Sequence, residues 1–149
     1  MNKSALAMPL GLNADRFAIR NAVTAIRNAY MRVDGRQLLV LGGAERRATV
    51  RVGLKVPVRI TPADVDHGEV HPYSGVGSVI EGLSEGISLG GLGLSHSTRV
   101  PSECAIVRFD ILGEEPVYLA VEMVWSNRST DGSWTSGARI LGLTDPVAL

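Results

Sequence analysis

Two arginines, Arg47 and Arg51, stand four residues apart just before an alternating apolar run, and Arg46 is adjacent to the first of them. In an extended chain, residues i and i+4 point to the same face and lie roughly 13 Å apart. Each guanidinium can form paired hydrogen bonds with a phosphate or with the O6/N7 edge of a guanine. The pair therefore fits the two ends of a flat, doubly charged ligand better than a single phosphate. A solvated charged face is the ordinary alternative for paired arginines.

The second candidate site is the glycine-rich stretch EGISLGGLGL at residues 85–94. Glycine is used where another group approaches the backbone closely or where a turn would make a side chain clash. Residues 86–90 also match the G-x-S-x-G pattern of a hydrolase nucleophile elbow, which needs a helix after the serine and then an acid and a histidine. Here the following residues are poor helix formers, and only His96 follows, with no acid before it. We therefore expect no catalytic residues and no enzyme.

Phosphate loops and metal sites are also disfavoured. No lysine follows the glycines as a P-loop requires, and residues 75–77 lack the third glycine of a dinucleotide fingerprint. His67 and His71 have a spacing that suits metal binding on a helix, but a glycine and a proline beside them argue against a helix. We expect these histidines to be solvated loop residues, with no metal bound.

Composition and charge limit the class of partner. The chain has 149 residues, with 15 Lys and Arg against 15 Asp and Glu, and its formal net charge is zero. Nucleic-acid binders usually carry a basic excess, so no nucleic-acid polymer is expected as a partner. No apolar stretch approaches the ~18 residues that span a membrane, so we expect no membrane span and a cytoplasmic, bacterial-type protein. The single cysteine, Cys104, excludes an internal disulfide and is expected to be a small core residue.

One helix is predicted to accompany these candidate sites. Residues 13–33 carry apolar side chains at spacings of two to four with arginines between them, which is typical of an amphipathic helix. Asn13 or Asp15 could cap its start, and Gly35 could end it. The apolar stripe must cover either this chain or another one. Three arrangements stay open: a cap on the end of the chain's own barrel, a docking face for a partner, and a homodimer formed through the helix.

The rest of the chain carries strand patterns. Residues 49–60 alternate apolar and other side chains in strict period two, which is a strong strand signal. Residues 61–78 are mostly turn formers and are predicted to be a long connection. Further strands are predicted at residues 78–86, 89–95, 104–112, 116–126 and 134–143. Five to seven strands with hairpin-length links indicate a small antiparallel barrel or sandwich. The predicted domains are a helical extension at 1–44 and a β domain at 45–149.

The order of the two candidate sites resembles the PilZ domain family, whose pattern is R-x-x-x-R followed by (D/N)-x-S-x-x-G. Arg47 and Arg51 match the first part, and Ser88 and Gly91 match the second. Gly86 stands where the family has Asp or Asn.

The resemblance covers about residues 45–144 and includes a W-x-x-G-x-x-I segment that begins at Trp134. It implies an all-β fold, namely a small six-stranded antiparallel PilZ-like β-barrel with an N-terminal α-helix. It also implies a receptor for cyclic di-GMP rather than an enzyme, with no cofactor other than this ligand. The receptor would transmit the second-messenger signal to a downstream protein partner.

The arginines would hold guanine edges and phosphates, the serine would hydrogen-bond the ligand, and the glycines would leave room for it. The ligand-binding residues that the resemblance implies are Arg46, Arg47, Arg51, Ser88, Gly90 and Gly91.

Gly86 implies weakened binding, because the missing carboxylate would accept hydrogen bonds from a guanine N1/N2 edge. Such a charged hydrogen bond contributes roughly 1.5–3 kcal/mol, or about 10- to 100-fold in affinity. Glu85 or Ser84 could substitute, although Glu85 would point to the opposite face of a regular strand. The alternative function is a PilZ-like protein-interaction adaptor that binds nucleotide weakly or not at all.

Overall fold

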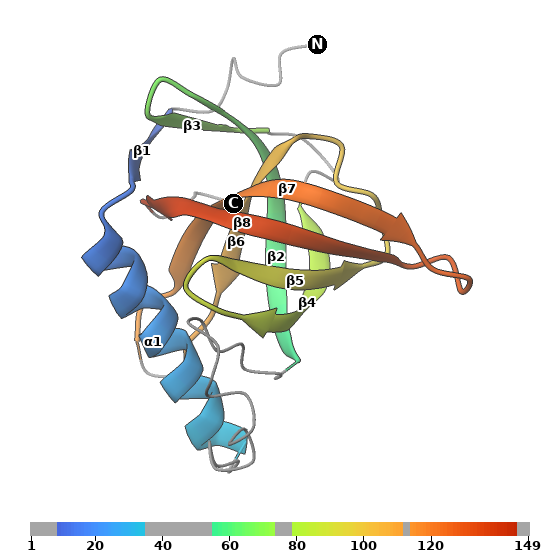
Figure 1. Cartoon of the computed structure of the whole chain (residues 1–149), viewed down its shortest axis with the longest axis horizontal. Helices are drawn as coiled ribbons and strands as arrows, with labels where there is room; N and C mark the ends of the chain where they lie inside the picture. The colour runs from blue at the N-terminus through green and yellow to red at the C-terminus, as the bar shows by residue number, and fades with distance from the viewer. Residues whose placement is uncertain (1–8, 35–54, 74–78, 112–113, 146–149) are drawn as a thin grey trace.

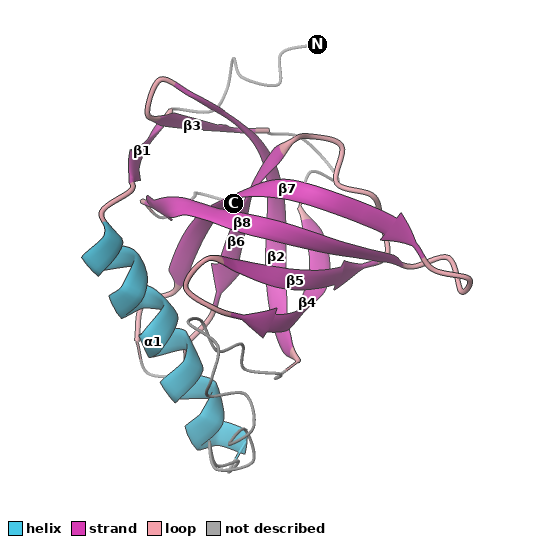
Figure 2. Cartoon of the chain, in the orientation of Figure 1, coloured by secondary structure: helices cyan, strands magenta, loops and turns pink. Residues whose placement is uncertain are grey.

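The structure, a computed structural model, describes residues 9–34, 55–73, 79–111 and 114–145, without the side chains of residues 30–34. This part of the chain consists of one helix, α1 (Arg16–Asp34), and eight strands (Figures 1 and 2). The strands are β1 (Leu10–Asn13), β2 (Val56–Asp66), β3 (Glu69–Pro72), β4 (Ile80–Ile87), β5 (Gly91–His96), β6 (Cys104–Phe109), β7 (Val117–Arg128) and β8 (Trp134–Thr144). Within the described residues, no helix has both the length and the apolar character needed to cross a membrane.

All eight strands join in one antiparallel sheet. β2 pairs with β4, β4 with β5, β5 with β8, β8 with β7, β7 with β6, and β6 again with β2. The pairings therefore return to their starting strand, and we call this circuit the closed sheet. β3 extends from β2, and β1 links β3 to β8 in a second, smaller circuit. The mostly antiparallel β architecture with one helix agrees with the all-β prediction.

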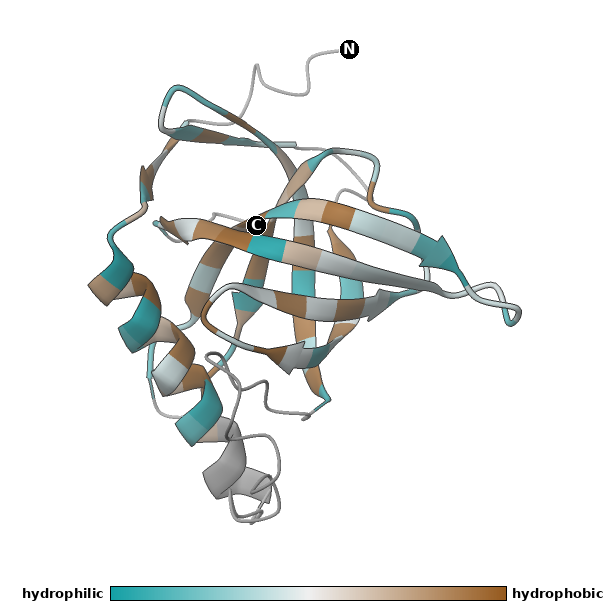
Figure 3. Ribbon diagram, in the orientation of Figure 1, coloured by the Kyte–Doolittle hydropathy of each residue, from teal (hydrophilic) through white to brown (hydrophobic). Residues whose placement is uncertain are grey.

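The interior of the closed sheet is filled by aliphatic side chains from alternate strand positions. In β2, Val56, Val58 and Ile60 are buried while the residues between them are exposed. The predicted period-two strand is thus confirmed for its described part, and residues 49–54 lie outside the described residues. Figure 3 shows apolar and polar residues along the strands, and β5, β6 and β7 each include at least three consecutive buried residues. The strands predicted after residue 78 are all present, with ends that differ by a few residues.

The long connection predicted at residues 61–78 is wrong over residues 61–72, and residues 74–78 lie outside the described residues. Residues 61–66 continue β2, and β3 follows after a tight turn at His67 and Gly68, whose φ angles are 51° and 76°. Two consecutive positive φ angles are typical of the two-residue turn that best fits strand twist. The turn-forming residues of this segment thus belong to a hairpin rather than to a loop. Buried Val70 of β3 packs in a second apolar cluster under β1 and β3.

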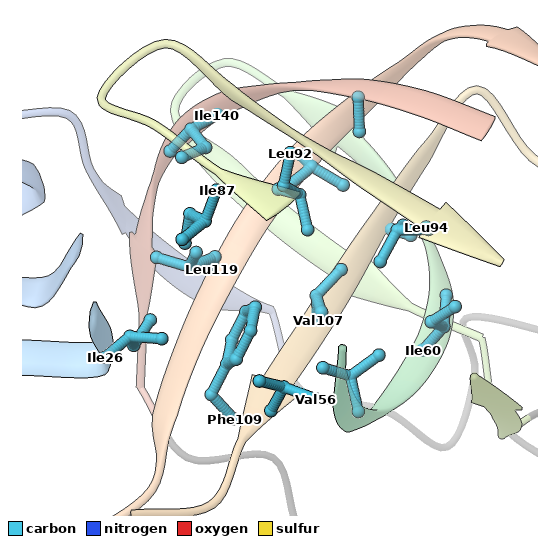
Figure 4. Packing of buried hydrophobic residues seen from close by; sticks show 14 of the residues in the cluster. Ile26, Val56, Ile60, Ile87, Leu92, Leu94, Val107, Phe109, Leu119 and Ile140 are labelled. Carbon is cyan, nitrogen blue, oxygen red and sulfur yellow. The ribbon is translucent and has the colours of Figure 1, made fainter. Parts of the chain in front are cut away.

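Helix α1 covers one end of the closed sheet. The helix begins after Asp15, whose carboxylate accepts a hydrogen bond from the N–H of Ala18 (3.2 Å). Of the two predicted caps, Asp15 is therefore the residue that caps the helix. Val23 and Ile26 are buried in the same cluster as the interior of the sheet. Figure 4 shows Ile26 pointing from the helix toward Phe109. The middle of the apolar stripe is therefore covered by the chain's own core, as in the capping arrangement among the three left open, whereas Phe17 at the start of the helix is 71% exposed.

Candidate ligand-binding site

The predicted serine and glycines lie in the hairpin between β4 and β5. The backbone N–H and the Oγ of Ser88 both donate to the carbonyl of Gly91, at 2.9 and 3.3 Å. This hairpin leads from strand to strand, whereas a nucleophile elbow leads from strand to helix. The local geometry of G-x-S-x-G here is thus that of a tight turn, in which the serine hydroxyl stabilises the turn itself.

The two glycines after Ser88 have different reasons to be glycine. A Cβ added to Gly91 would lie 2.6 Å from the carbonyl oxygen of Ala138, which is too close for any real contact. Gly91 is therefore required by the approach of β8. A Cβ on Gly90 would meet nothing within 4 Å. The carbonyl of Gly90 accepts a hydrogen bond from the N–H of Ile140 (3.2 Å), which ties the turn to β8.

A β-bulge interrupts β4 within the predicted motif. Ser84 pairs with Leu94 but Gly86 pairs with Gly93, so Glu85 is the extra residue. The bulge shifts the alternation of side chains, and Ile87 points into the core. Gly86, aligned with Gly93 of β5, is on the opposite face of the strand from Ile87, whereas Ser88 follows the last residue of β4 and is only 7% exposed. The regular strand assumed for Glu85 from the sequence is therefore not present.

The outer face beside this hairpin carries an arginine that sequence reasoning did not select. Arg139 is aligned with Gly91 across β5 and β8, and it lies between the core residues Ala138 and Ile140. Its side chain is 61% exposed, and its guanidinium donates two hydrogen bonds to the carboxylate of Glu122. Only the strand register reveals this position, because Arg139 is far from the motif in sequence.

The predicted arginines Arg46, Arg47 and Arg51 lie outside the described residues. Lys55 is the first described residue after them, and its ammonium lies 3.9 Å from the carboxylate of Glu85. The next residue, Val56, pairs with Ser84. The chain that carries the arginines therefore joins the closed sheet directly beside the bulge.

The histidines of the predicted loop are in a hairpin and pair with nearby carboxylates. His67 lies 2.8 Å from Asp66, and His71 lies 3.7 Å from Glu69. Among the residues that the structure describes, no three His, Cys, Asp or Glu side chains gather as a metal site would need. Cys104 is partly buried at the start of β6. Burial, followed by the charge of Glu122, raises the pKa of its thiol.

A hydrogen-bonded chain of three side chains lies at the opposite end of β5. His96 Nε2 is 2.9 Å from Ser136 Oγ, and Ser136 Oγ is 2.9 Å from Ser126 Oγ. His96 Nδ1 lies 2.6 Å from the carbonyl of Thr98. His96 and Ser136 are 4% and 0% exposed, whereas Ser126 is exposed. Sequence reasoning considered His96 as a partner of Ser88 and as a possible metal ligand, but not as a partner of Ser136, because the register of β5 against β8 could not be read.

Ser126 also lines a cavity of about 460 Å³. The indole of Trp125 forms part of its wall and lies across Gly137 of β8, where a side chain would collide with the ring. Trp125 is 48% exposed and Val124 is 63% exposed. The cavity is lined by Arg99, Val100, Ser102, Glu103, Met123, Val124, Trp125, Ser126 and Trp134.

Two regions could therefore take up a ligand or partner: the outer face around Ser88 and the cavity at the other end of β5. No protein-family model matches the sequence, and no curated protein matches it. A fold alone does not define a function, so the function has to follow from these residues and their surroundings.

Proposed function

We propose that the chain is a receptor for cyclic di-GMP that transmits the signal of this second messenger to a partner protein. In this proposal the closed sheet is a six-stranded PilZ-like β-barrel, and the ligand is held between the segment with Arg47 and Arg51 and the outer face around Ser88. The supporting observation is the pairing of Val56 with Ser84, which joins the arginine-bearing chain to the sheet beside the motif.

Chain length limits how far the arginines can be from this face. Arg51 is four residues before Lys55, so their Cα atoms are separated by at most about 14 Å. Lys55 itself is in contact with Glu85, one residue from Gly86. Chain length therefore allows the guanidinium of Arg51 to reach a ligand placed over Gly86 and Ser88, whereas the Cα atom of Arg47, eight residues before Lys55, can be up to about 29 Å from that of Lys55.

The outer face supplies complementary groups. The exposed guanidinium of Arg139 suits a phosphate or a guanine O6/N7 edge. The bulge at Glu85 brings a carboxylate next to the position where the family has Asp or Asn, and this carboxylate could accept from a guanine N1/N2 edge. Ser88 is only 7% exposed, so ligand binding has to uncover it. A rearrangement on binding is what a receptor needs in order to pass on a signal.

Isothermal titration with cyclic di-GMP tests the proposal. Removing two charged, paired hydrogen-bonding groups in Arg47→Ala/Arg51→Ala should weaken binding by about 100-fold or more. The matched control is Arg16→Ala/Arg20→Ala, which removes two exposed arginines of the same spacing from α1 and should bind like wild type. Equal loss in both double variants would indicate non-specific attraction of an anion and would contradict the proposal.

Two single variants test the arrangement around the bulge. Gly86→Asp restores the family's acidic residue and should tighten binding by about 10- to 100-fold. Glu85→Gln should weaken it if this carboxylate substitutes for the missing one. The φ angle of Gly86 is 158°, so a denaturation curve must show that Gly86→Asp folds before its affinity is compared.

The alternative is a PilZ-like adaptor that binds nucleotide weakly or not at all. The exposed side chains of Val124 and Trp125 favour contact with a partner protein, irrespective of any nucleotide. If wild-type protein gives no heat at ~100 μM cyclic di-GMP, the receptor proposal fails and the adaptor is supported.

A further inference from the structure

Strand β7 is longer than its neighbour β6, so the end of β7 extends past the last residue that pairs with β6. Its residues 117–122 pair with β6, and the N–H of Met123 donates to the carbonyl of Glu103 (2.7 Å). Beyond this point, residues 125–128 pair only with β8 among the described strands. Figure 1 shows the ends of β7 and β8 extending together beyond the other strands. Within the part of the chain that the structure describes, one edge of β7 is therefore unpaired over this stretch.

The hairpin hydrogen bonds show which backbone groups point to this open edge. The N–H of Ser129 donates to the carbonyl of Ser133 (2.7 Å), so the backbone of Ser129 faces β8. In an antiparallel pair this orientation alternates, so Asn127 also faces β8, while Ser126 and Arg128 turn their N–H and C=O groups to the open edge. An unpaired edge of this kind is a template for another extended chain.

The cavity lies against the same edge. Residues 123–126 form one wall, and the segment 99–103 forms another. Its volume of about 460 Å³ is in the range of small binding pockets. The exposed apolar surface of Val124 and Trp125 borders it, so an apolar side chain that entered the cavity would contact indole and aliphatic groups.

The hydrogen-bonded side chains of His96, Ser136 and Ser126 leave an acceptor at the cavity, which suits an N–H group of a peptide main chain. The carbonyl of Thr98 can only accept, so in neutral His96 the proton is on Nδ1 and Nε2 accepts from Ser136. Ser136 in turn accepts from Ser126, which leaves the Ser126 oxygen as an acceptor toward the cavity.

The charges of the cavity wall do not favour a polyelectrolyte. Arg99 and Glu103 contribute one charge of each sign. This balance does not select a nucleic acid or another polyanion, which would need a basic surface. A neutral polypeptide backbone, with both N–H and C=O groups, fits it better.

We propose that this edge and cavity bind an extended peptide segment of a partner protein. The segment adds a strand beside residues 124–128 and inserts an apolar side chain between Trp125 and the 99–103 wall. Main-chain hydrogen bonds give the affinity in this mode of recognition, and the pocket gives the specificity. β5 separates this site from Ser88 by its whole length, so the inference does not depend on the nucleotide proposal.

The test uses the full chain, immobilised and panned against a library of random peptides about twelve residues long. We expect enriched sequences that alternate apolar and polar residues. Trp125→Ala should weaken their binding by about 30-fold, as for a central aromatic contact. Arg128→Pro removes one edge-facing N–H and should also weaken binding, whereas the matched variant Arg128→Ala, which removes only the side chain, should not.

A measurement on the wild-type protein avoids the risk that Arg128→Pro fails to fold. On binding an enriched peptide, the amides of Ser126 and Arg128 should become protected from hydrogen exchange, while that of Asn127, already paired with β8, should change little. The absence of enriched peptides, or equal binding to all variants, would overturn the proposal. A concentration-dependent dimer that Arg128→Pro abolishes would also overturn it, because the occupant would then be a second copy of the chain.

Discussion

Ser136 Oγ of β8 forms a hydrogen bond of 2.9 Å with Nε2 of the His96 imidazole on β5, and both side chains are almost completely buried. The bond joins the two strands at the end of the sheet where the cavity lies. A buried imidazole with both nitrogens in hydrogen bonds is held in one orientation, and the exposed Ser126 hydroxyl is oriented through it. The hydrogen-bonded side chains of His96, Ser136 and Ser126 therefore help to form the cavity wall.

Removing the hydroxyl of Ser136, the middle member of the three hydrogen-bonded side chains, should destabilise the fold. Ser136→Ala leaves the buried Nε2 of His96 without a donor, which costs about 1–3 kcal/mol of unfolding free energy. Ser126→Ala removes the exposed hydroxyl among these three side chains and should change the unfolding free energy by less than about 0.5 kcal/mol. Urea denaturation compares the two. Equal effects would show that the buried hydrogen bond contributes nothing specific.

Adjacent glycines in the β4–β5 turn should respond very differently to the same substitution. Gly91→Ala places a methyl group against the Ala138 carbonyl, a backbone atom that cannot move freely, and should cost about 1–3 kcal/mol. Gly90→Ala meets open space and should be nearly neutral, within about 0.5 kcal/mol. Thermal unfolding of both variants checks this. A stable Gly91→Ala protein would contradict the close approach of β8.

The helix should be an integral part of the folded unit. Ile26 is 2% exposed within the core cluster, so Ile26→Ala should lower the unfolding free energy by about 2–5 kcal/mol. Phe17, on the same helix, is 71% exposed, and Phe17→Ala should have little effect. Chemical denaturation followed by circular dichroism measures both. If Ile26→Ala only melts helical signal and leaves the β signal intact, the helix is a separate extension.

Cys104 should react slowly with thiol reagents at neutral pH. Burial and the nearby carboxylates, chiefly Glu122, raise the pKa of its thiol, and the thiolate is the reactive form. Its alkylation rate should reach half of its maximum at a pH above that of a free cysteine, about 8.5. The pH profile in urea should return to the free value. A folded-state midpoint below that of the unfolded chain would contradict this environment.

The parts of the fold that could be predicted are those with a local periodic signal. The alternation of Val56, Val58 and Ile60 and the stripe on α1 both arise from burial of one face, so the sequence carries them directly. β1 and β3 have only four residues each, too few to show a period, and they form because β2 and β8 offer them edges. Such strands depend on partners that are distant in sequence.

The candidate site was predictable only to the extent that its residues follow one another in the chain. Gly86, Ser88 and Gly91 are within one hairpin, so a short motif can find them. Arg139 reaches the same face through the pairing of β8 with β5, and the Ser136–His96 bond depends on the same register. A register shift of two residues would keep each side chain on its face and yet bring different residues together, and the local pattern cannot distinguish these registers.

The position of β8 has a consequence for how the protein is made. β8 comes last among the described strands and pairs with β5, β7 and β1, so both strand circuits need it. A nascent chain on the ribosome that lacks β8 would expose the unpaired edges of three strands. The sheet can therefore close only after residue 144 has left the ribosomal tunnel, and the exposed edges of the earlier strands are prone to aggregation until then.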